Sequence, residues 1–343
     1  MTTIISVPPT LVERVGPLAT ALPPAIARLP ETGITYPFDR VPPQRMGFGA
    51  ALVEAVTSSR IEGIDVSVTQ AALAILQPRY ALVTDAGRAV AANFHAVTDA
   101  LAGIARYDDH RAAHDRLMKG QHTPAFAGFR ETFVRVGDHV APAPRRVWEL
   151  MVDLAEFTSS HQSTVVNAAL AHAQFETIHP YADGNGRIGR ALLVGALRAP
   201  VSPWLLMERP SYYDALRDYR LGDAGPLVEL VAAAADHGFD INEETDDCQP
   251  DLDGLSEEAL DVVARLHERP VGTRRRMVPA GSKRLSAGFS ELIAREQVVA
   301  VSDDCGLDTV YAYLPVVLTW LRLAPTGRVQ THYSGKWKRE IRV

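Results

Sequence analysis

Apolar residues recur at helical spacing along most of the first 240 residues of the chain. Between residues 145 and 157 they fall three or four positions apart, which places them on one face of a helix. Residues 167–178 and 227–235 are rich in alanine and poor in β-branched residues, a composition that favours buried helices. The pattern therefore predicts a mainly α-helical protein. The apolar positions of the first helix are Val147, Leu150, Met151, Leu154 and Phe157.

One segment interrupts the helical pattern. Residues 131–137, E-T-F-V-R-V-G, are β-branched and aromatic, and they lie between Gly128 and the turn-rich sequence D-H-V-A-P-A-P. This composition is typical of a short strand or a β-hairpin.

After residue 255 the pattern changes to two helices and a hairpin. Ser256 is placed to cap a helix that runs to Glu268, with Glu257 and Glu258 in its first turn. A second helix is expected over residues 282–295, and the sequences V-V-A-V-S, D-D-C-G-L-D and T-V-Y-A-Y-L then indicate strand, turn and strand. Helix, helix and hairpin in this order predict a winged-helix-like domain.

Charge and proline content divide the chain into four parts. The net charge of the 343 residues is −6, but residues 255–343 hold 14 basic against 10 acidic side chains. Residues 240–254 contain seven acidic and no basic residues, which predicts a linker. Residues 1–40 contain seven prolines. The predicted parts are an N-terminal segment that wraps the core (1–44), a helical core (45–239), the acidic linker (240–254) and the winged-helix-like domain (255–343).

The composition also excludes several classes of protein. The two cysteines, Cys248 and Cys305, are too few for a disulfide framework or a cysteine-based zinc site, which favours a reducing compartment. The start of the chain does not resemble a signal peptide, and no uninterrupted apolar run reaches the roughly 18 residues of a membrane span. We therefore expect a cytoplasmic protein without a membrane partner.

The segment with the most chemical information is residues 178–190, I-H-P-Y-A-D-G-N-G-R-I-G-R, which lies between two helical patterns. Pro180 disfavours a helical conformation at His179, so the imidazole is expected at a helix end, free to enter a cleft. The glycines at 184 and 186 allow positive φ and close backbone approach. Residues 183–187 are therefore expected to form a nest of N–H groups at a helix start, which binds phosphate.

Two arginines in this segment predict an anion nearby. Arg187 and Arg190 lie three residues apart in the first turn of the next helix, where the helix dipole disfavours cations. A negatively charged group should therefore lie between them. With Asp183 as an oxygen ligand and His179 as a general base, the set fits a polyphosphate with Mg²⁺.

Two other motifs overlap this segment. Its three glycines match G-x-G-x-x-G, with Glu208 about 20 residues further on, as in dinucleotide-binding folds. A helical pattern rather than a strand precedes them, however. His179 and Asp183 are spaced like zinc ligands on a helix, but Pro180 interrupts the helix and no second imidazole motif follows. Both a dinucleotide site and a zinc hydrolase are less favoured than the polyphosphate site.

The sequence H-P-Y-A-D-G-N-G-R-I-G-R resembles the signature of the Fic family, H-x-F-x-D/E-G-N-G-R-x-x-R, with Tyr181 in place of the usual phenylalanine. The resemblance covers about residues 45–235. It includes the upstream helix A-H-A-Q-F-E-T-I, the hairpin R-E-T-F-V-R-V-G, which looks like the target-docking flap of the family, and the later S-Y-Y-D-A-L. It implies a Fic-type helical core with a β-hairpin flap, and transfer of AMP from ATP to a protein hydroxyl.

The resemblance also implies roles for individual residues. His179 would deprotonate a Ser, Thr or Tyr hydroxyl of the target, and Asp183 would hold Mg²⁺ on the α- and β-phosphates. Arg187 and Arg190 would neutralise the β- and γ-phosphates. A tyrosine pair after the motif would line the adenine pocket, although two aromatic residues in a helical sequence also fit a core. The ATP-binding residues implied in this way are Gly184, Asn185, Gly186, Arg187, Ile188, Gly189, Arg190, Tyr212 and Tyr213.

Residues 58–63, S-S-R-I-E-G, resemble the inhibitory motif of the family, S/T-x-x-x-E-G/N. Gly63 suits the position after a helix end, so Glu62 would lie in the last turn. A carboxylate there interacts unfavourably with the helix dipole unless a nearby cation neutralises it. Ser58, one turn earlier, is placed to orient it. By resemblance the cation is Arg190, and the pair would hold ATP in an unproductive pose. An exposed glutamate at a frayed helix end is the simpler alternative.

The sequence thus predicts a Mg²⁺-dependent protein adenylyltransferase restrained by Glu62, acting on an unidentified target and able to modify itself. One alternative is a de-AMPylase in which Glu62 positions water. Another is a DNA-binding regulator that acts through its C-terminal domain. The basic residues that would contact DNA phosphates there are Arg274, Arg275, Arg276, Lys283 and Arg284. A solvated basic surface explains these residues equally well. A homodimer is compatible with the sequence.

Overall fold

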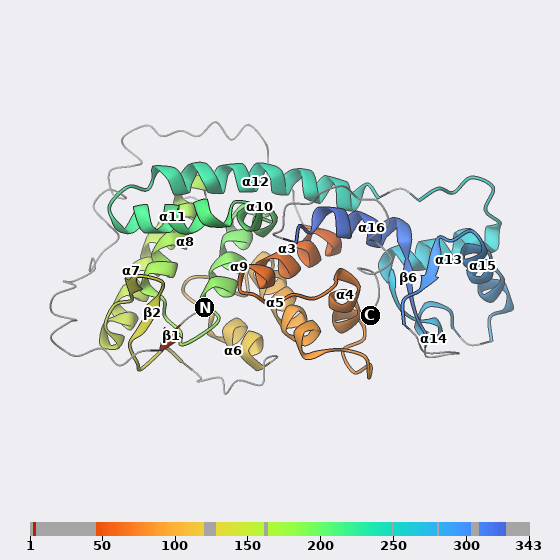
Figure 1. The fold of residues 1–343 in the computed structure, drawn as a ribbon, viewed down its shortest axis with the longest axis horizontal. Coiled ribbons are helices and arrows are strands. Elements are labelled where there is room, and N and C mark those ends of the chain that lie inside the picture. Colours follow the sequence, from red (N-terminus) through yellow and green to blue (C-terminus); the bar gives the residue numbers. More distant parts are fainter. Residues whose placement is uncertain are drawn as a thin grey trace.

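The computed structural model describes residues 3–4, 46–119, 128–160, 164–248, 250–279, 281–302 and 309–326. Helices predominate, as predicted, and they form an elongated molecule with a smaller C-terminal part at one end (Figure 1). The helices of the larger part are α3 (Phe48–Ile61), α4 (Val68–Leu76), α5 (Asp85–Leu101), α6 (Arg111–Lys119), α7 (Val147–Ser160), α8 (Val165–Ile178), α9 (Asn185–Leu197), α10 (Ser202–Met207), α11 (Arg209–Arg220) and α12 (Gly225–Asp246), with a 3-10 turn, η1 (Pro144–Arg146).

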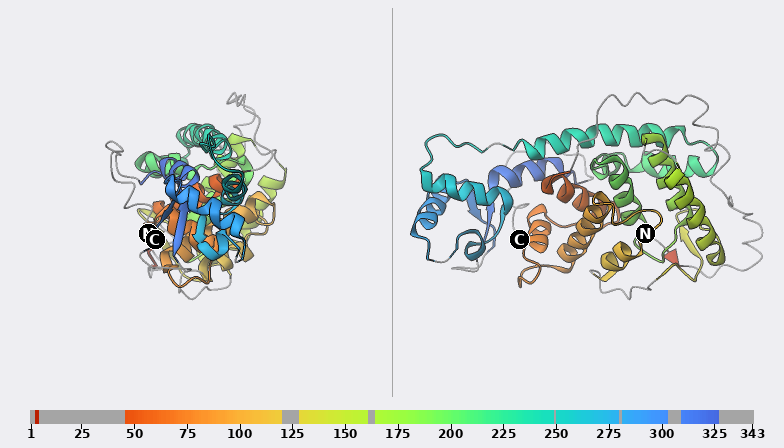
Figure 2. Two further views of the ribbon diagram at one scale, coloured as in Figure 1. Left: turned by 90° about the vertical axis from the view of Figure 1, so that its right-hand side faces the viewer. Right: turned by 180° about the vertical axis from the view of Figure 1, so that it is seen from behind.

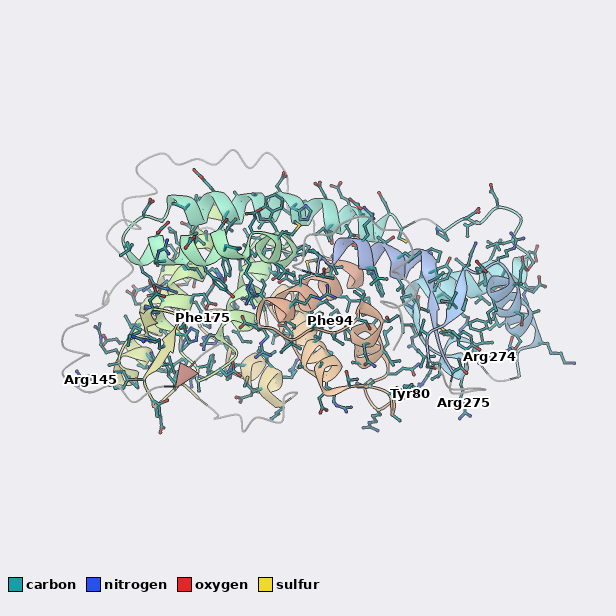
Figure 3. All side chains as sticks on the ribbon, in the orientation of Figure 1. Tyr80, Phe94, Arg145, Phe175, Arg274 and Arg275 are labelled. Carbon is teal, nitrogen blue, oxygen red and sulfur yellow. The ribbon has the colours of Figure 1, made fainter. Side chains whose placement is uncertain are left out.

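The centre of the larger part is the antiparallel pair α8 and α9. Alanines on α8 keep its surface small, so that α7, α9 and α12 pack closely around it. The side chain of Thr164 caps its first turn by accepting a hydrogen bond from the Asn167 N–H. Phe94 of α5 and Phe175 of α8 are both buried in the core of the larger part (Figure 3). The turn between α8 and α9 is therefore held between two packed helices.

A small antiparallel sheet lies beside this turn. It contains β1 (Thr3–Ile4), β2 (Val134–Val136) and β3 (His139–Val140), in the order β1-β2-β3. Gly137, with a φ of 59°, makes the tight turn between β2 and β3 possible. The predicted hairpin is thus confirmed. Apart from β1, the predicted wrapping segment 1–44 lies outside the described residues.

The C-terminal part contains the two helices that the sequence predicted, with a short strand and a short helix between them. Ser256 and Ser282 cap them, each accepting a hydrogen bond from a backbone N–H three residues later. Its elements are α13 (Glu257–Glu268), β4 (Val271–Thr273), α14 (Arg274–Met277), α15 (Lys283–Ala294), β5 (Val298–Ala300), β6 (Val310–Tyr313) and α16 (Leu314–Leu323). The predicted pair β5 and β6 is antiparallel, and β4 extends it in the order β4-β6-β5. The winged-helix assignment itself stays a prediction.

The predicted linker over residues 240–254 is wrong in its first half. Helix α12 continues to Asp246, because Phe239, Ile241 and Asn242 are buried on one of its faces while the acidic side chains lie on the others. An ion pair between Glu244 and Arg322 then joins α12 to α16.

Helix α16 connects the two parts of the molecule. It packs on α3, α4 and α12, and it lies beside α3 in the front and back views (Figures 1 and 2). The C-terminal part is therefore docked on the larger part and not only tethered to it. None of the helices in the described ranges combines the length and apolar character that crossing a bilayer requires.

Candidate active site

A cavity of about 660 Å³ opens between the β2–β3 hairpin, the α8–α9 turn, α11 and the end of α3. It brings together residues that lie up to 159 positions apart in the sequence, from Glu62 to Leu221. The predicted site residues that line it are Glu62, His179, Asp183, Gly184, Asn185, Gly186, Arg190, Tyr212 and Tyr213.

His179 ends α8 at the wall of this cavity. Its backbone is left-handed, with φ of 51°, and its N–H still donates to the carbonyl of Phe175. Its Nδ1 lies 3.9 Å from the Glu176 carboxylate, one helical turn back. Burial and the charge of Arg130 lower the pKa of His179 to about 3, so the ring is neutral at pH 7. A neutral imidazole is able to accept a proton.

The turn after His179 is fixed by side chains. Asn185 accepts from the Tyr181 N–H at 2.8 Å and donates to the Tyr181 carbonyl at 2.9 Å. The Tyr181 hydroxyl contacts His110 Nδ1 at 2.8 Å, and its ring stacks on His114 at 3.5 Å. Tyrosine in place of the expected phenylalanine thus has a polar partner. His114 Nε2 also lies 2.9 Å from the carbonyl oxygen of Asp183.

Helix α9 starts with the glycines that the sequence singled out, and each one acts differently. Gly184 has the expected positive φ of 82°. Gly186 is helical, but a Cβ there would lie 2.2 Å from Glu62 Oε1, so the absent side chain makes room for the carboxylate. Gly189 faces α8, where a Cβ would lie 2.4 Å from Glu176 Oε1. Gly189 and the core residue Ile188 therefore do not line the cavity, unlike Gly184, Asn185 and Gly186.

The negative group expected beside Arg190 is Glu62, from a helix 128 residues earlier. Arg190 Nη2 donates to Glu62 Oε1 at 2.8 Å and to the Ser58 carbonyl at 2.9 Å, and Nε donates to Ser58 Oγ at 3.0 Å. Burial alone would lower the pKa of Arg190, but the charge of Glu62 and its hydrogen bond, together with the charges of neighbouring groups, outweigh burial and raise that pKa. Burial alone would raise the pKa of Glu62, but the charge and hydrogen bond of Arg190, together with the charge of Arg187, outweigh burial and lower that pKa. Both groups are therefore charged.

The end of α3 presents Glu62 in a defined geometry. The Gly63 N–H donates to the Arg60 carbonyl and the Ile64 N–H to the Ser59 carbonyl, which is the Schellman pattern. Gly63 has the positive φ of 83° that this pattern requires. The Glu62 side chain is 28% exposed, while that of Arg190 is 2% exposed. The frayed, exposed glutamate considered as an alternative is not what the structure contains.

Arg187 is held differently from Arg190. Its side chain is 3% exposed, its Nη2 lies 3.9 Å from Asp183 Oδ1, and it does not line the cavity. Asp183 also accepts from the Gly184 N–H at 2.7 Å, and its side chain stays half exposed at the cavity wall. The anionic partner of Arg187 is thus the carboxylate of the same turn.

The tyrosine pair divides between core and surface. Tyr212 lines the cavity but is only 1% exposed, and its hydroxyl lies 2.8 Å from His172 Nε2. Burial raises the pKa of Tyr212. Tyr213 is 45% exposed and lies against Arg209, whose Nε donates to its hydroxyl at 3.2 Å. Of the two, Tyr213 offers the accessible ring.

Arg130 was not predicted from the sequence, yet it ties the hairpin to the His179 turn. Its guanidinium donates to the carbonyls of His179, Ile178, Pro142 and Thr132, while its N–H donates to the Pro180 carbonyl. Burial lowers its pKa to about 10, so it remains a cation. His139 adds a second tie, with Nε2 2.9 Å from the Thr177 carbonyl oxygen. No local pattern marks Arg130, since its partners are backbone atoms.

Glu176 lines the cavity and was not predicted from the sequence. It is 7% exposed, and burial, together with the charge of Glu62, raises its pKa to about 7. Its position three residues before His179 is one helical turn, and that spacing was the signal in the sequence that could have identified it.

The residues present fit a magnesium ion that a nucleotide brings with it. No cluster of three or more acidic, His or Cys side chains suited to a metal exists among the described residues. Magnesium in nucleotide sites is commonly held by only one or two carboxylates together with phosphate oxygens and water. Asp183, at the cavity wall beside the α9 N-terminus, supplies such a carboxylate.

Comparison with known proteins identifies similar chains. Residues 105–197 match the model of the Fic/DOC family. A protein from Nematostella vectensis named protein adenylyltransferase Fic is 32% identical over 140 residues, which cover 39% of this chain and 33% of the relative. A protein of the same name from Drosophila grimshawi is 36% identical over 136 residues, covering 37% of this chain and 28% of the relative. The matched region is thus about a third or less of each of these relatives.

One solved structure is similar over nearly the whole chain. The crystal structure of a Fic family protein from Desulfovibrio desulfuricans G20 has a TM-score of 0.51 and 22% identity, covering 90% of this chain and 97% of that one. This is a likeness of fold.

Proposed function

Because residues 105–197 of this chain form a Fic domain, we propose that the protein is an adenylyltransferase that moves AMP from ATP to a hydroxyl of a protein. The observation that carries the proposal is one cavity that holds a neutral imidazole, a helix N-terminus and a buried arginine. These groups supply a base, N–H donors and a cation, which phosphoryl-group chemistry requires.

In the proposed reaction the target hydroxyl oxygen attacks the α-phosphorus of ATP. The new O–Pα bond forms while the bond from Pα to the bridging oxygen breaks, and pyrophosphate leaves with that electron pair. The hydroxyl proton passes to His179, through the ring nitrogen that does not face Glu176. The first N–H groups of α9 and the Arg190 guanidinium stabilise the charge on the phosphate oxygens.

Asp183 would hold Mg²⁺ against the phosphates in this reaction. Bound there, the ion would supply positive charge to the phosphate oxygens. Tyr213, as the accessible ring of the tyrosine pair, is the better candidate for contact with adenine.

Inhibition by Glu62 is part of the proposal. The carboxylate occupies Nη2 of Arg190, a donor that a phosphate would use, and it fills the space above Gly186. ATP bound beside it would meet a like charge, which displaces the γ-phosphate from Arg190. The inhibited protein would therefore bind ATP without turning it over efficiently.

Mass spectrometry of the purified protein after incubation with ATP tests this function. We expect a fraction of molecules to gain the mass of one AMP when Mg²⁺ is present and none when a chelator replaces it. Fragmentation should place the AMP on a Ser, Thr or Tyr side chain. Addition of phosphate in place of AMP would contradict the proposal, as would the absence of any adduct in a variant without the Glu62 carboxylate.

A further inference from the structure

The helix that presents Glu62 is also the helix on which the C-terminal part docks. Trp320 of α16 is 3% exposed, and its ring lies 5.6 Å from that of Phe48 at the start of α3. A Cβ at Gly49 would lie 2.5 Å from Trp320 Nε1, so the small residue permits the close approach. The two helices thus touch through well-packed side chains at the beginning of α3.

The contact at the other end of α3 is made by Arg60, inside the S-S-R-I-E-G segment. Its Nη1 donates to the carbonyls of Ala324 at 2.8 Å and Pro325 at 3.0 Å, directly after the last residue of α16. A cation at this place is favourable, because the carbonyl end of a helix carries partial negative charge. The Arg60 side chain is 9% exposed, so little water competes for these bonds.

The same guanidinium also holds the turn that follows Glu62. Its Nε donates to Asp65 Oδ1 at 3.1 Å and its Nη2 to the Val66 carbonyl at 3.2 Å. The Arg60 carbonyl meanwhile accepts from the Gly63 N–H. One residue therefore joins the end of α3, the turn beyond Glu62 and the end of α16.

The rest of α3 is anchored to the larger part without Arg60. Glu54 accepts from the Ser202 N–H at 2.8 Å, and Asn93 donates to Ser59 Oγ at 3.2 Å. Removal of the Arg60 side chain therefore leaves most of α3 in place. What loses its support is the segment from Arg60 to Val66, which carries Glu62.

We propose that Arg60 is a positioning residue for Glu62, and that it makes the inhibitory Glu62–Arg190 ion pair depend on the docked C-terminal part. Arg60 and Glu62 are two residues apart, so their side chains leave the helix in different directions, one toward α16 and the other toward Arg190. The coupling passes through the shared helix end. The inference rests on the proposed function, since it concerns the restraint of that activity.

The test is AMP incorporation from ATP and Mg²⁺ by the full-length protein in two backgrounds. Arg60→Ala is expected to raise incorporation by about fivefold or more, the lower range of a coupling between two sites. In a Glu62→Gly background the same substitution should change incorporation by less than about twofold, since the restraint is already gone. Arg88→Ala, which removes an exposed arginine paired with Asp85 on α5, is the matched control and should behave like wild type.

A second measurement does not depend on activity. Hydrogen exchange of the Glu62, Gly63 and Ile64 amides should be at least about tenfold faster in Arg60→Ala, while exchange in α9 stays unchanged. If Arg60→Ala does not fold, Trp320→Leu serves as the second variant. It weakens the contact between α16 and α3 from the side of α16, and it should speed hydrogen exchange at the same amides. Arg60→Lys keeps the charge but not the forked geometry, so its incorporation should fall between wild type and Arg60→Ala.

The outcomes separate this inference from the proposed function. If Glu62→Gly raises incorporation while Arg60→Ala leaves both incorporation and amide exchange at wild-type values, the coupling is absent and the proposed function stands. If Arg60→Ala lowers incorporation equally in both backgrounds, its role is general support of the fold and the inference is wrong. If Glu62→Gly shows no incorporation at all, the proposed function fails, and the inference fails with it.

Discussion

At the scale of single residues, burial sets the protonation states on which the proposed chemistry depends. His179 has a pKa of about 3 and Glu176 a pKa of about 7, both because the cavity wall removes water from the charged form. The imidazole is therefore a free base across the physiological range. Glu176, by contrast, changes its protonation near neutral pH.

We expect His179→Ala to lower AMP transfer by about 10²-fold or more, the usual contribution of a general base, without weakening ATP binding. In the proposed reaction His179 acts on the incoming hydroxyl, whereas α9 and Arg190 would hold the nucleotide. The measurement is transfer rate together with the Kd of ATP by calorimetry. Transfer at the wild-type rate in this variant would show that His179 is not the general base.

Glu176 should make the stability of the protein depend on pH. Its ordinary pKa of 4.5 is raised to about 7 in the folded state, so the folded protein binds the proton more tightly than the unfolded chain does. This stabilisation is fully present below about pH 4.5 and is lost as the pH rises through 7, by up to about 3 kcal/mol.

Glu176→Gln, which cannot ionise, tests this dependence. Urea unfolding near pH 5 and near pH 8 should show that the wild type loses more free energy of unfolding between the two values than the variant does. An equal loss in both proteins would assign the pH dependence to other groups.

At the scale of elements, the β2–β3 hairpin and the α8–α9 turn are one unit because Arg130 joins them. Arg130→Ala leaves buried carbonyls without donors and frees the turn that aims His179. We expect a loss of about 3 kcal/mol or more in the free energy of unfolding, together with a fall in kcat. Arg135→Ala, on β2 of the same hairpin, is the control. If the two variants lose similar amounts of free energy of unfolding, any substitution in the hairpin is destabilising, and Arg130 is not what joins the hairpin to the α8–α9 turn.

The elements that the sequence predicted are those with a local signal. The Ser256 cap, the helical pattern over residues 282–295 and the β-branched segment 131–137 gave helix and strand positions that the structure confirms. Strand β4 and helix α14 were not predicted, because segments of three and four residues are too short to show a period. Residues 240–246 were expected in a linker because of their acidic composition. They belong to α12 instead, because Phe239 and Ile241 are buried against the larger part.

The same distinction holds within the candidate site. The residues of the 178–190 segment could be identified from their order alone, as could Glu62 from its resemblance to a known motif. Arg130 donates to backbone carbonyls of the His179 turn, and Arg60 donates to those at the end of α16. These carbonyls are distant in the sequence, so no pattern of side chains along the chain predicts the contacts. The division of Tyr212 and Tyr213 between core and surface likewise depends on which side α11 presents to α8.

At the scale of the whole molecule, Arg274 and Arg275 of the C-terminal part lie far from Phe175 of α8, the helix that ends at the cavity (Figure 3). Arg274 lies over the ring of Phe289 at 5.7 Å, and Arg284 pairs with Asp261 at 2.8 Å, so part of the predicted phosphate-binding charge is already engaged. We predict at most weak DNA binding that falls steeply with salt, carried by Arg274, Arg275 and Arg276. Titration of duplex DNA at two salt concentrations measures it. Binding that persists after all three are changed to Gln would contradict this assignment.

The central claim is that Glu62 restrains AMP transfer through Arg190, and one measurement tests it most directly. AMP incorporation from ATP is compared between the wild type and Glu62→Gly, with Glu62→Gly/His179→Ala as the control for chemistry at this site. We predict that Glu62→Gly raises incorporation by about tenfold or more, because it frees a guanidinium and removes a like charge from the phosphate site, and that the double variant shows none. The variant should also unfold more easily, since Arg190 stays buried without its carboxylate. Incorporation by Glu62→Gly at or below the wild-type level would contradict the claim, and loss of AMP removal from a modified target in that variant would instead identify Glu62 as the group that positions water.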